Sequence, residues 1–342
     1  MNTARTILAI AGLAVLAACA GSDDDAVVNV YSHRHYEADQ QLFDRFTELT
    51  GIDVNVVTAS ADELITRLEN EGEASPADVL ITVDAGRLHR AKERELLQSV
   101  TSETLESNVP EHLRDRDGQW WGLTQRARVI AYHRERVDSA NELSTYEALA
   151  EPEWDDRVLI RSSANVYNQS LLASIIANHG EDEAAAWAEG IVENMARTPS
   201  GGDTDQVMAV AAGAGDVAIV NTYYIARLVE SSNEEEQRVV EQIGVFFPNQ
   251  GDRGTHVNVS GAGVTRYADN VENAVALLEF LTGEEAQGVF AEANQEYPVH
   301  PDVPWSETLQ SWGEFQADTL DLTVLGELND SAVRIFDRAG WR

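Results

Sequence analysis

The sequence predicts an α/β fold of two lobes with a ligand cleft between them. Apolar strands are expected at Val27–Tyr31, Ile52–Val57 and Val79–Val83, and helical segments separate them. Strands that alternate with helices imply a parallel sheet covered by helices. A second α/β unit begins at Val158–Ile160. Because roughly 320 residues after processing exceed a comfortable single core, two lobes are expected.

The first two helices have clear buried faces. The helix before Gly51 places four apolar residues on one face at helical spacing, and Gly51 suits a left-handed stop. We expect this face to be core: Leu42, Phe43, Phe46 and Leu49. The helix Ala61–Glu71 should bury Leu64, Ile65 and Leu68.

The chain is expected to pass between the lobes more than once. Trp120–Leu123 and Ala127–Tyr132 are interpreted as an extended crossover, and Val245–Pro248 and His256–Ser260 as the return. We therefore assign 27–126 with about 254–304 to the first lobe, and 127–253 with about 305–342 to the second. The remaining expected elements are helices Asn168–Asn178, Asp182–Asn194, Val271–Leu281 and Glu284–Asn294 and strand Asp216–Val220. Repeated crossing makes a hinge, and a hinge implies closure over a ligand.

The N-terminus has the pattern of an export signal. Arg5 precedes the apolar run Ile7–Leu16, and small residues follow as far as Cys19, so residues 1–18 are interpreted as a signal peptide. A retained membrane helix is the weaker interpretation because a span needs roughly 20 apolar residues. Cys19 is the only cysteine, which excludes an intrachain disulfide, and it stands where a bacterial lipobox places the lipidated residue. A buried thiol is the alternative. Residues 19–26 would then be a polar tether, and the protein a membrane-anchored periplasmic lipoprotein.

The chain is strongly acidic. Its formal charge is −35, and removal of the signal takes away one arginine and no acid. Nucleic acid is therefore excluded as a partner. The acidic residues are scattered, so they indicate solvated faces, and solubility in a salty medium explains them better than cation attraction.

Four tyrosines follow predicted strands: Tyr36, Tyr167, Tyr223 and Tyr224. The carboxyl ends of strands in an open α/β sheet are where ligand groups gather, so the four phenols are expected to converge. Val220–Thr222 is interpreted as a strand end with a helix cap, which would put the adjacent pair on one first turn about 100° apart. The alternative for such a pair is one core and one surface residue. His35 alone is better explained as an exposed loop residue.

Several motifs occur in the order found in a known family. They are Val30–Tyr36, Ala77–Gly86, Arg126–Ile130, Asn221–Tyr224 and Val245–Gln250. Together they resemble the ferric-ion-binding lipoproteins of bacterial ABC import systems over nearly the whole mature chain. The resemblance implies the type II periplasmic-binding-protein fold, with each lobe a mixed, mainly parallel sheet flanked by helices. It also implies Fe³⁺ held by Tyr36 from the first lobe and by Tyr167, Tyr223 and Tyr224 from the second, with His35 as a fifth ligand in some members.

Two arginines are assigned around this site. Arg126 matches a family position near the metal, where it would offset phenolate charge or hold an anion, although a surface salt bridge explains it equally well. Arg227, one turn beyond the tyrosine pair, is the weaker candidate. Some relatives bind iron with fewer tyrosines and a carbonate or phosphate, so a synergistic carbonate is allowed here but not required.

The chemistry of phenolates favours a trivalent cation. A free tyrosine has a pKa near 10, so binding several phenolates at neutral pH expels several protons, which only a strongly charged cation can offset. Zinc and copper sites use histidine and thiolate, and calcium and magnesium sites use clustered carboxylates. The sequence thus favours ferric iron, delivered by a monomeric receptor to an ABC permease and ATPase.

Two other functions stay open. A receptor for a small organic or anionic solute, such as a polyamine or phosphonate, would also suit a cleft lined by Tyr and Trp, and it would bind without a metal. A non-transport lipoprotein adhesin ranks lower. No catalytic residues are assigned, because the chain has no Gly-x-Ser-x-Gly elbow, no His-Glu-x-x-His and no cysteine nucleophile.

Overall fold

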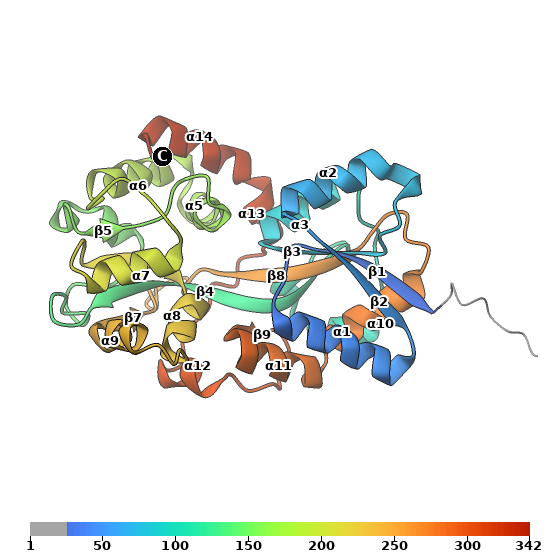
Figure 1. Cartoon of the computed structure of the whole chain (residues 1–342). Coiled ribbons are helices and arrows are strands. Elements are labelled where there is room, and N and C mark those ends of the chain that lie inside the picture. The colour runs from blue at the N-terminus through green and yellow to red at the C-terminus, as the bar shows by residue number, and fades with distance from the viewer. Residues whose placement is uncertain (1–25) are drawn as a thin grey trace, which may run out of the picture.

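The computed structural model describes residues 26–342 as two halves joined by long strands (Figure 1). The predicted signal peptide, Cys19 and nearly all of the tether lie outside the described residues. Within residues 26–342, no helix has the length and apolar character needed to cross a bilayer.

The first half contains a β-α-β-α-β unit, as predicted. Its elements are β1 (Val27–Ser32), α1 (Glu37–Thr50), β2 (Asp53–Thr58), α2 (Ala61–Glu71), β3 (Val79–Val83), α3 (Ala85–Glu93) and α4 (Glu103–Asn108). The segments that return to this half are β8 (Val257–Val264), α10 (Val271–Thr282), α11 (Glu284–Asn294) and β9 (Tyr297–Pro298).

The second half is mostly helical around a short sheet. It contains β5 (Val158–Leu159), α5 (Val166–His179), α6 (Glu181–Glu193), α7 (Asp203–Ala211), β6 (Val217–Asn221), α8 (Thr222–Val229), α9 (Glu234–Gln242) and β7 (Ile243–Phe246). Three of these helices, α7, α8 and α9, had no predicted bounds. The chain ends with α12 (Glu307–Ser311), α13 (Thr323–Glu327) and α14 (Asn329–Ala339).

The strands form one mixed sheet in the order β2-β1-β3-β8-β4-β6-β5, and β7 and β9 also pair with β4 (Trp121–His133). Parallel pairing is limited to β1 with β2, β1 with β3, and β5 with β6. All other pairings among the described strands are antiparallel. The predicted predominance of parallel strands was therefore wrong, because the segments that cross between the halves run against the strands they join.

Strand β4 belongs to both halves. It pairs with β8 as far as Ala127 and with β6 from Arg128 onward. The two crossover segments predicted from the sequence are thus one continuous strand of 13 residues. The partner change falls between two neighbouring residues, so the backbone at that point is fixed by hydrogen bonds to both halves.

Helix α1 confirms most of its predicted face. Leu42, Phe43 and Phe46 are buried, and Phe46 packs 5.6 Å from Phe280 of α10 between ring centroids. Leu49, predicted as core, is 52% exposed, although it shares this face; it lies in the last turn of the helix, just before the left-handed Gly51.

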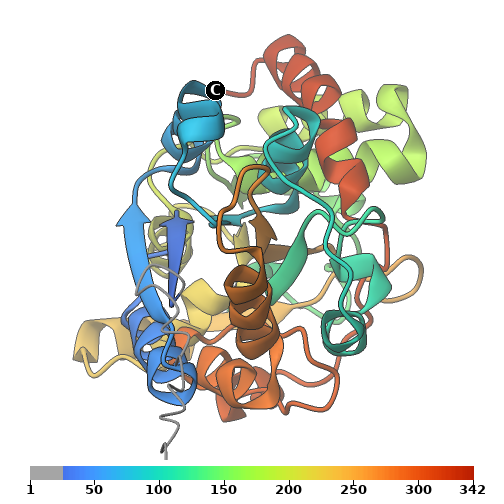
Figure 2. The same ribbon diagram turned by 90° about the vertical axis from the view of Figure 1, so that its right-hand side faces the viewer.

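The C-terminal tail contacts both halves. Helix α14 packs on α5 and α6, and Figures 1 and 2 both place it beside them. Helix α13 instead packs on α3 of the first half as well as on α5. The tail therefore lies mainly on the second half and touches the first.

The difference between Phe46 and Leu49 predicts unequal effects on stability. Phe46→Ala should lower the free energy of unfolding by about 3–5 kcal/mol, because it leaves a cavity in a packed core. Leu49→Ala should change it by no more than about 0.5 kcal/mol. Urea unfolding followed by circular dichroism measures both, and equal losses would contradict the observed packing of α1.

Candidate metal centre

Tyr223 and Tyr224 lie on the first turn of α8, as predicted. Asn221 ends β6 and has extended backbone angles as the residue before the helix, so the two tyrosines follow directly from a strand end. Tyr223 is 1% exposed and Tyr224 is half-buried, and their ring centroids are 4.2 Å apart. The pair is therefore not made of one core residue and one surface residue.

Tyr167 lies on the first turn of α5. This helix begins two residues earlier than predicted, with Asn165 as its cap, and the Asn165 side chain accepts a hydrogen bond from the Tyr167 backbone N–H at 3.1 Å. The Tyr167 hydroxyl lies 3.2 Å from the Tyr223 hydroxyl. Two helix starts of the second half therefore bring phenol oxygens into direct contact.

Tyr36 reaches the same place from the first half. It is half-buried and precedes α1. The guanidinium carbon of Arg227 lies 4.6 Å from the Tyr36 ring centroid and 5.1 Å from that of Tyr223, so one arginine contacts a phenol from each half. The structure thus brings together all four tyrosines selected from the sequence.

His35 lies at the edge of this group. Its ring stacks on Tyr36 with centroids 5.8 Å apart, and the side chain is exposed. Its Nδ1 atom is 3.4 Å from the backbone oxygen of His33. In the described structure His35 forms no hydrogen bond with Tyr167, Tyr223 or Tyr224.

Arg126 is a buried residue and not part of a surface salt bridge. It is 2% exposed, and its guanidinium carbon lies 5.9 Å from the Tyr167 ring centroid and 5.8 Å from that of Tyr223. It donates a hydrogen bond to Ser260 and lies 3.5 Å from a carboxylate oxygen of Glu296. Burial alone would lower the pKa of Arg126, but Glu296 and the nearby phenols raise it, so the guanidinium stays charged.

Glu296 is shared with a second buried arginine that the sequence analysis did not select. Arg34 donates to Glu296 at 3.0 Å and to Asp39 at 2.9 Å, and its guanidinium carbon lies 4.9 Å from the Tyr36 ring centroid. Burial would raise the pKa of Glu296, but Arg34 and Arg126 hold it below its usual range. Arg34 stands two residues before Tyr36, and this proximity in the sequence could have identified it. No sequence pattern marks Glu296.

A corresponding network backs the tyrosines of the second half. The Tyr167 ring centroid is 5.8 Å from the guanidinium carbon of Arg128 and 5.6 Å from that of Arg161. Both arginines pair with the buried carboxylate of Asp203. Around the phenols there are thus five arginines (Arg34, Arg126, Arg128, Arg161, Arg227) and three carboxylates (Asp39, Asp203, Glu296), an excess of two positive charges in a chain of formal charge −35.

The surroundings of Tyr223 and Tyr224 favour the protonated phenol. Burial raises the pKa of Tyr223 well above its ordinary value, and the neighbouring phenols Tyr167 and Tyr224 raise it further. Burial likewise raises the pKa of Tyr224, with Tyr167 adding to the effect. Ionising several of these groups together requires a positive charge placed among them.

The donor set is oxygen-rich and hard. In the part of the chain that the structure describes, no group of three or more His, Cys, Asp or Glu side chains is placed to hold a metal ion. The candidate centre therefore consists of phenol oxygens with arginines around them, an arrangement that suits a highly charged hard cation.

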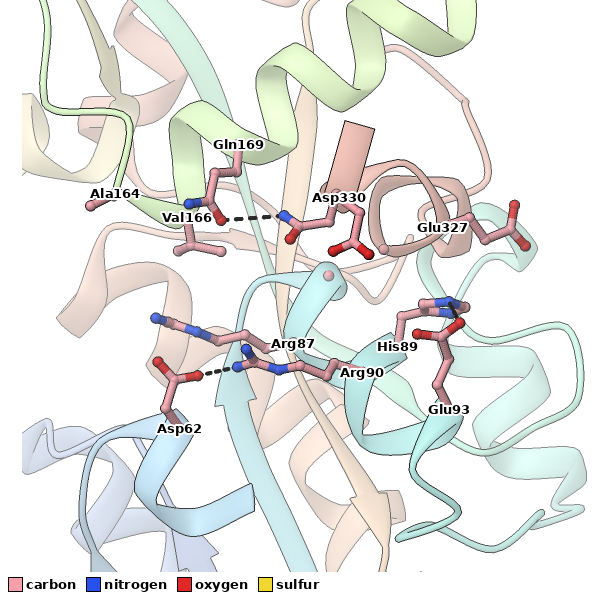
Figure 3. Close-up of a pocket in the computed structure, with 13 residues that line it drawn as sticks. Asp62, Arg87, His89, Arg90, Glu93, Ala164, Val166, Gln169, Glu327 and Asp330 are labelled. Carbon is pink, nitrogen blue, oxygen red and sulfur yellow. Dashed lines mark hydrogen bonds and ion pairs between the residues drawn. The ribbon is translucent and has the colours of Figure 1, made fainter. Parts of the chain in front are cut away.

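A polar pocket of about 290 Å³ lies beside the centre, between α2 and α3 of the first half and α5 and α14 (Figure 3). On the first-half side of the pocket Arg90 and Asp62 form an ion pair, and on the opposite side Gln169 accepts a hydrogen bond from Asn329. None of the four tyrosines lines this pocket. Its lining contains two arginines and four carboxylates, so its formal charge is negative.

The fold and the centre define the class as a two-lobed binding protein of the type II periplasmic kind. The chain belongs to the bacterial extracellular solute-binding protein family, whose model matches residues 74–316. The fold class predicted from the sequence is confirmed, since solved structures of such proteins superpose on nearly the whole chain.

Individual relatives are named for iron. The chain is 49% identical to iron uptake protein A1 of Synechocystis sp., over 100% of this chain and 97% of the relative. It is 28% identical to the major ferric iron-binding protein of Neisseria meningitidis serogroup B, covering 93% and 94%. The structure of Trichodesmium FutA (IdiA), in complex with iron and citrate ligands, matches with a TM-score of 0.90 and 50% identity over 92% of this chain and 100% of that one. The resemblance to ferric-binding proteins is thereby confirmed.

The raised pKa values predict a late titration of the metal-free protein. Tyr223 should ionise above pH 10, because its phenolate would be buried beside two other phenols. The ultraviolet absorbance of phenolate, recorded against pH for the unmodified chain and for Tyr223→Phe, isolates this residue as the difference between the curves. A difference that appears below pH 10 would contradict the described environment.

Proposed function

We propose that this protein captures ferric iron outside the cytoplasm through the phenolates of Tyr36, Tyr167, Tyr223 and Tyr224. The observation that carries the proposal is the convergence of these phenols from both halves, with the Tyr167 and Tyr223 hydroxyls 3.2 Å apart. We assign His35 as a further, more exposed ligand that joins from the edge of the site.

The surrounding charges support a trivalent guest. Four phenolates and Fe³⁺ leave one net negative charge, which the positive excess of the arginine network offsets. Arg227 forms no ion pair with any described residue, and it lies over Tyr36 and Tyr223, so it is the group best placed to balance that charge. Arg126 also helps to offset this negative charge, and its ion pair with Glu296 holds it in position. A synergistic anion such as carbonate is allowed by these arginines, but four phenolate ligands do not require one.

The receptor then delivers its iron to a membrane permease and ATPase. Because ligands come from both halves, iron stabilises the arrangement in which the halves are together, and the permease distinguishes loaded from empty receptor by that shape. We propose that Cys19 carries a lipid that anchors the monomeric protein at the membrane on the periplasmic side. No catalytic step is assigned to it.

The first test is the visible spectrum. Addition of ferric citrate to purified mature protein should produce an orange to red phenolate-to-iron charge-transfer band. Tyr223→Phe and Tyr224→Phe each remove one ligand oxygen, so each should lower the iron affinity by more than the roughly 10- to 100-fold cost typical of an outer-shell change. Competition with citrate measures the affinity.

Tyr267→Phe is the matched control, because Tyr267 is 40% exposed and is not among the converging phenols. It should leave both the band and the affinity unchanged. A protein that shows no band, and that instead binds a polyamine or phosphonate without metal, would be a receptor for an organic solute.

Iron affinity should also depend strongly on pH. Phenols that are protonated in the metal-free protein must lose their protons on binding, so affinity rises with pH and falls in acid. Linkage makes the change about tenfold per pH unit for each proton released. Titrations between about pH 5.5 and 8 against a chelator of known protonation give the number of protons, and a pH-independent affinity would rule out phenolate ligation.

A further inference from the structure

We propose that Asp203 is the positioning residue that holds the tyrosines of the second half in register for iron. The proposal rests on the function proposed above. Asp203 itself is not assigned as a ligand, and it acts through the residues next to the tyrosines.

Asp203 contacts the strand end that carries the adjacent tyrosine pair. Its Oδ2 atom accepts a hydrogen bond from the backbone N–H of Asn221 at 2.8 Å. Asn221 is the residue from which α8 starts, two positions before Tyr223. This bond fixes the backbone direction at the point where the chain turns from β6 into α8, and so fixes where the two phenols point.

The same carboxylate reaches Tyr167 through one arginine. Arg128 donates to Asp203 at 2.7 Å and to the side-chain oxygen of Asn168 at 2.8 Å. Asn168 immediately follows Tyr167, and its amide donates to the backbone oxygens of Arg161 and Ser162, which close the loop before α5. Tyr167 and the pair on α8 are therefore tied to a single carboxylate by short, buried bonds.

The position of Asp203 explains why its carboxylate is held in place. It is fully buried, and it is the first residue of α7, where the unpaired backbone N–H groups of the helix favour a negative charge. Arg161 approaches its other oxygen at 3.4 Å. Removing the carboxylate leaves the buried Arg128 without its counter-charge, which is strongly destabilising locally.

Charge and geometry predict opposite effects, which makes the proposal testable. Asp203 pairs with Arg128 and Arg161, which lie beside the Tyr167 ring, so by charge alone its removal would leave more positive charge near the phenols, ease phenolate formation and increase iron affinity. If Asp203 acts by positioning, its removal lets the phenols move apart and iron affinity falls. The sign of the change therefore separates the two roles.

The test compares Asp203→Asn with Asp115→Asn. Asp115 is a matched control in the first half: its side chain is also fully buried, it pairs with Lys92 at 2.7 Å, and it accepts hydrogen bonds from backbone N–H groups. We expect Asp203→Asn to lower iron affinity about 10- to 100-fold and to shift the charge-transfer maximum. Asp115→Asn should lower thermal stability without changing affinity or band position.

Other outcomes have definite meanings. Unchanged or increased affinity in Asp203→Asn, or an equal loss in both variants, would overturn the positioning role while the iron function stands. Absence of a charge-transfer band in the unmodified chain would instead refute the iron function itself. If Asp203→Asn does not fold, Asn168→Ala removes the connection from Arg128 to the loop before Tyr167 and keeps the bond between Asp203 and Asn221. That variant should shift the band and weaken binding, and an unaltered spectrum would then refute the proposal.

Discussion

The candidate centre depends on the point at which β4 changes partners. Arg126 and Arg128 lie two residues apart on this strand, so their side chains leave the same face of it. Arg126 is held by Ser260 and Glu296 of the first half, and Arg128 by Asp203 and Asn168 of the second. The strand pairs with β8 up to Ala127 and with β6 from Arg128 onward, so its backbone is fixed between the two arginines. The phenols from both halves meet next to these two fixed side chains.

Burial explains how the protein can hold Tyr223 and Tyr224 side by side without ionising them. Burial and mutual proximity keep these phenols protonated in the absence of a cation, so they carry no negative charges that would repel one another. The arginines that surround the rings then reduce the cost of phenolate formation once a cation arrives. A doubly charged ion would return less Coulomb energy for the same number of displaced protons, so the arrangement favours the higher charge.

Local sequence signals explain why the tyrosines, but not their supporting network, were predictable. Tyr223 and Tyr224 follow a strong β-strand pattern and a polar cap, and Tyr167 follows Asn165, a good helix-capping residue. Glu296 and Asp203 instead act on residues 170 and 18 positions away in their closest cases, Arg126 and Asn221. Pairing over such distances depends on which strands become neighbours, and the sequence analysis misjudged this order by predicting mainly parallel pairing. The prediction that Leu49 is buried was wrong for a related reason: helical spacing gives the face of a helix, but not how far along that face other elements cover it.

Direct contacts between protein side chains help to hold the two halves together. Arg227 of α8 lies over Tyr36, and Ser170 of α5 donates to both carboxylate oxygens of Asp84 at 2.8 Å, at the end of β3. Asn258 of β8 donates to the same carboxylate at 2.9 Å, so the interaction joins α5 to both β3 and β8 of the first half. Burial raises the pKa of Asp84, and Ser170 and the Gly86 backbone N–H oppose that shift. These contacts are made by protein groups alone. These contacts preorganise the two halves. Less of the free energy of metal binding is then spent on bringing the halves together, and more of it contributes to selectivity for the cation.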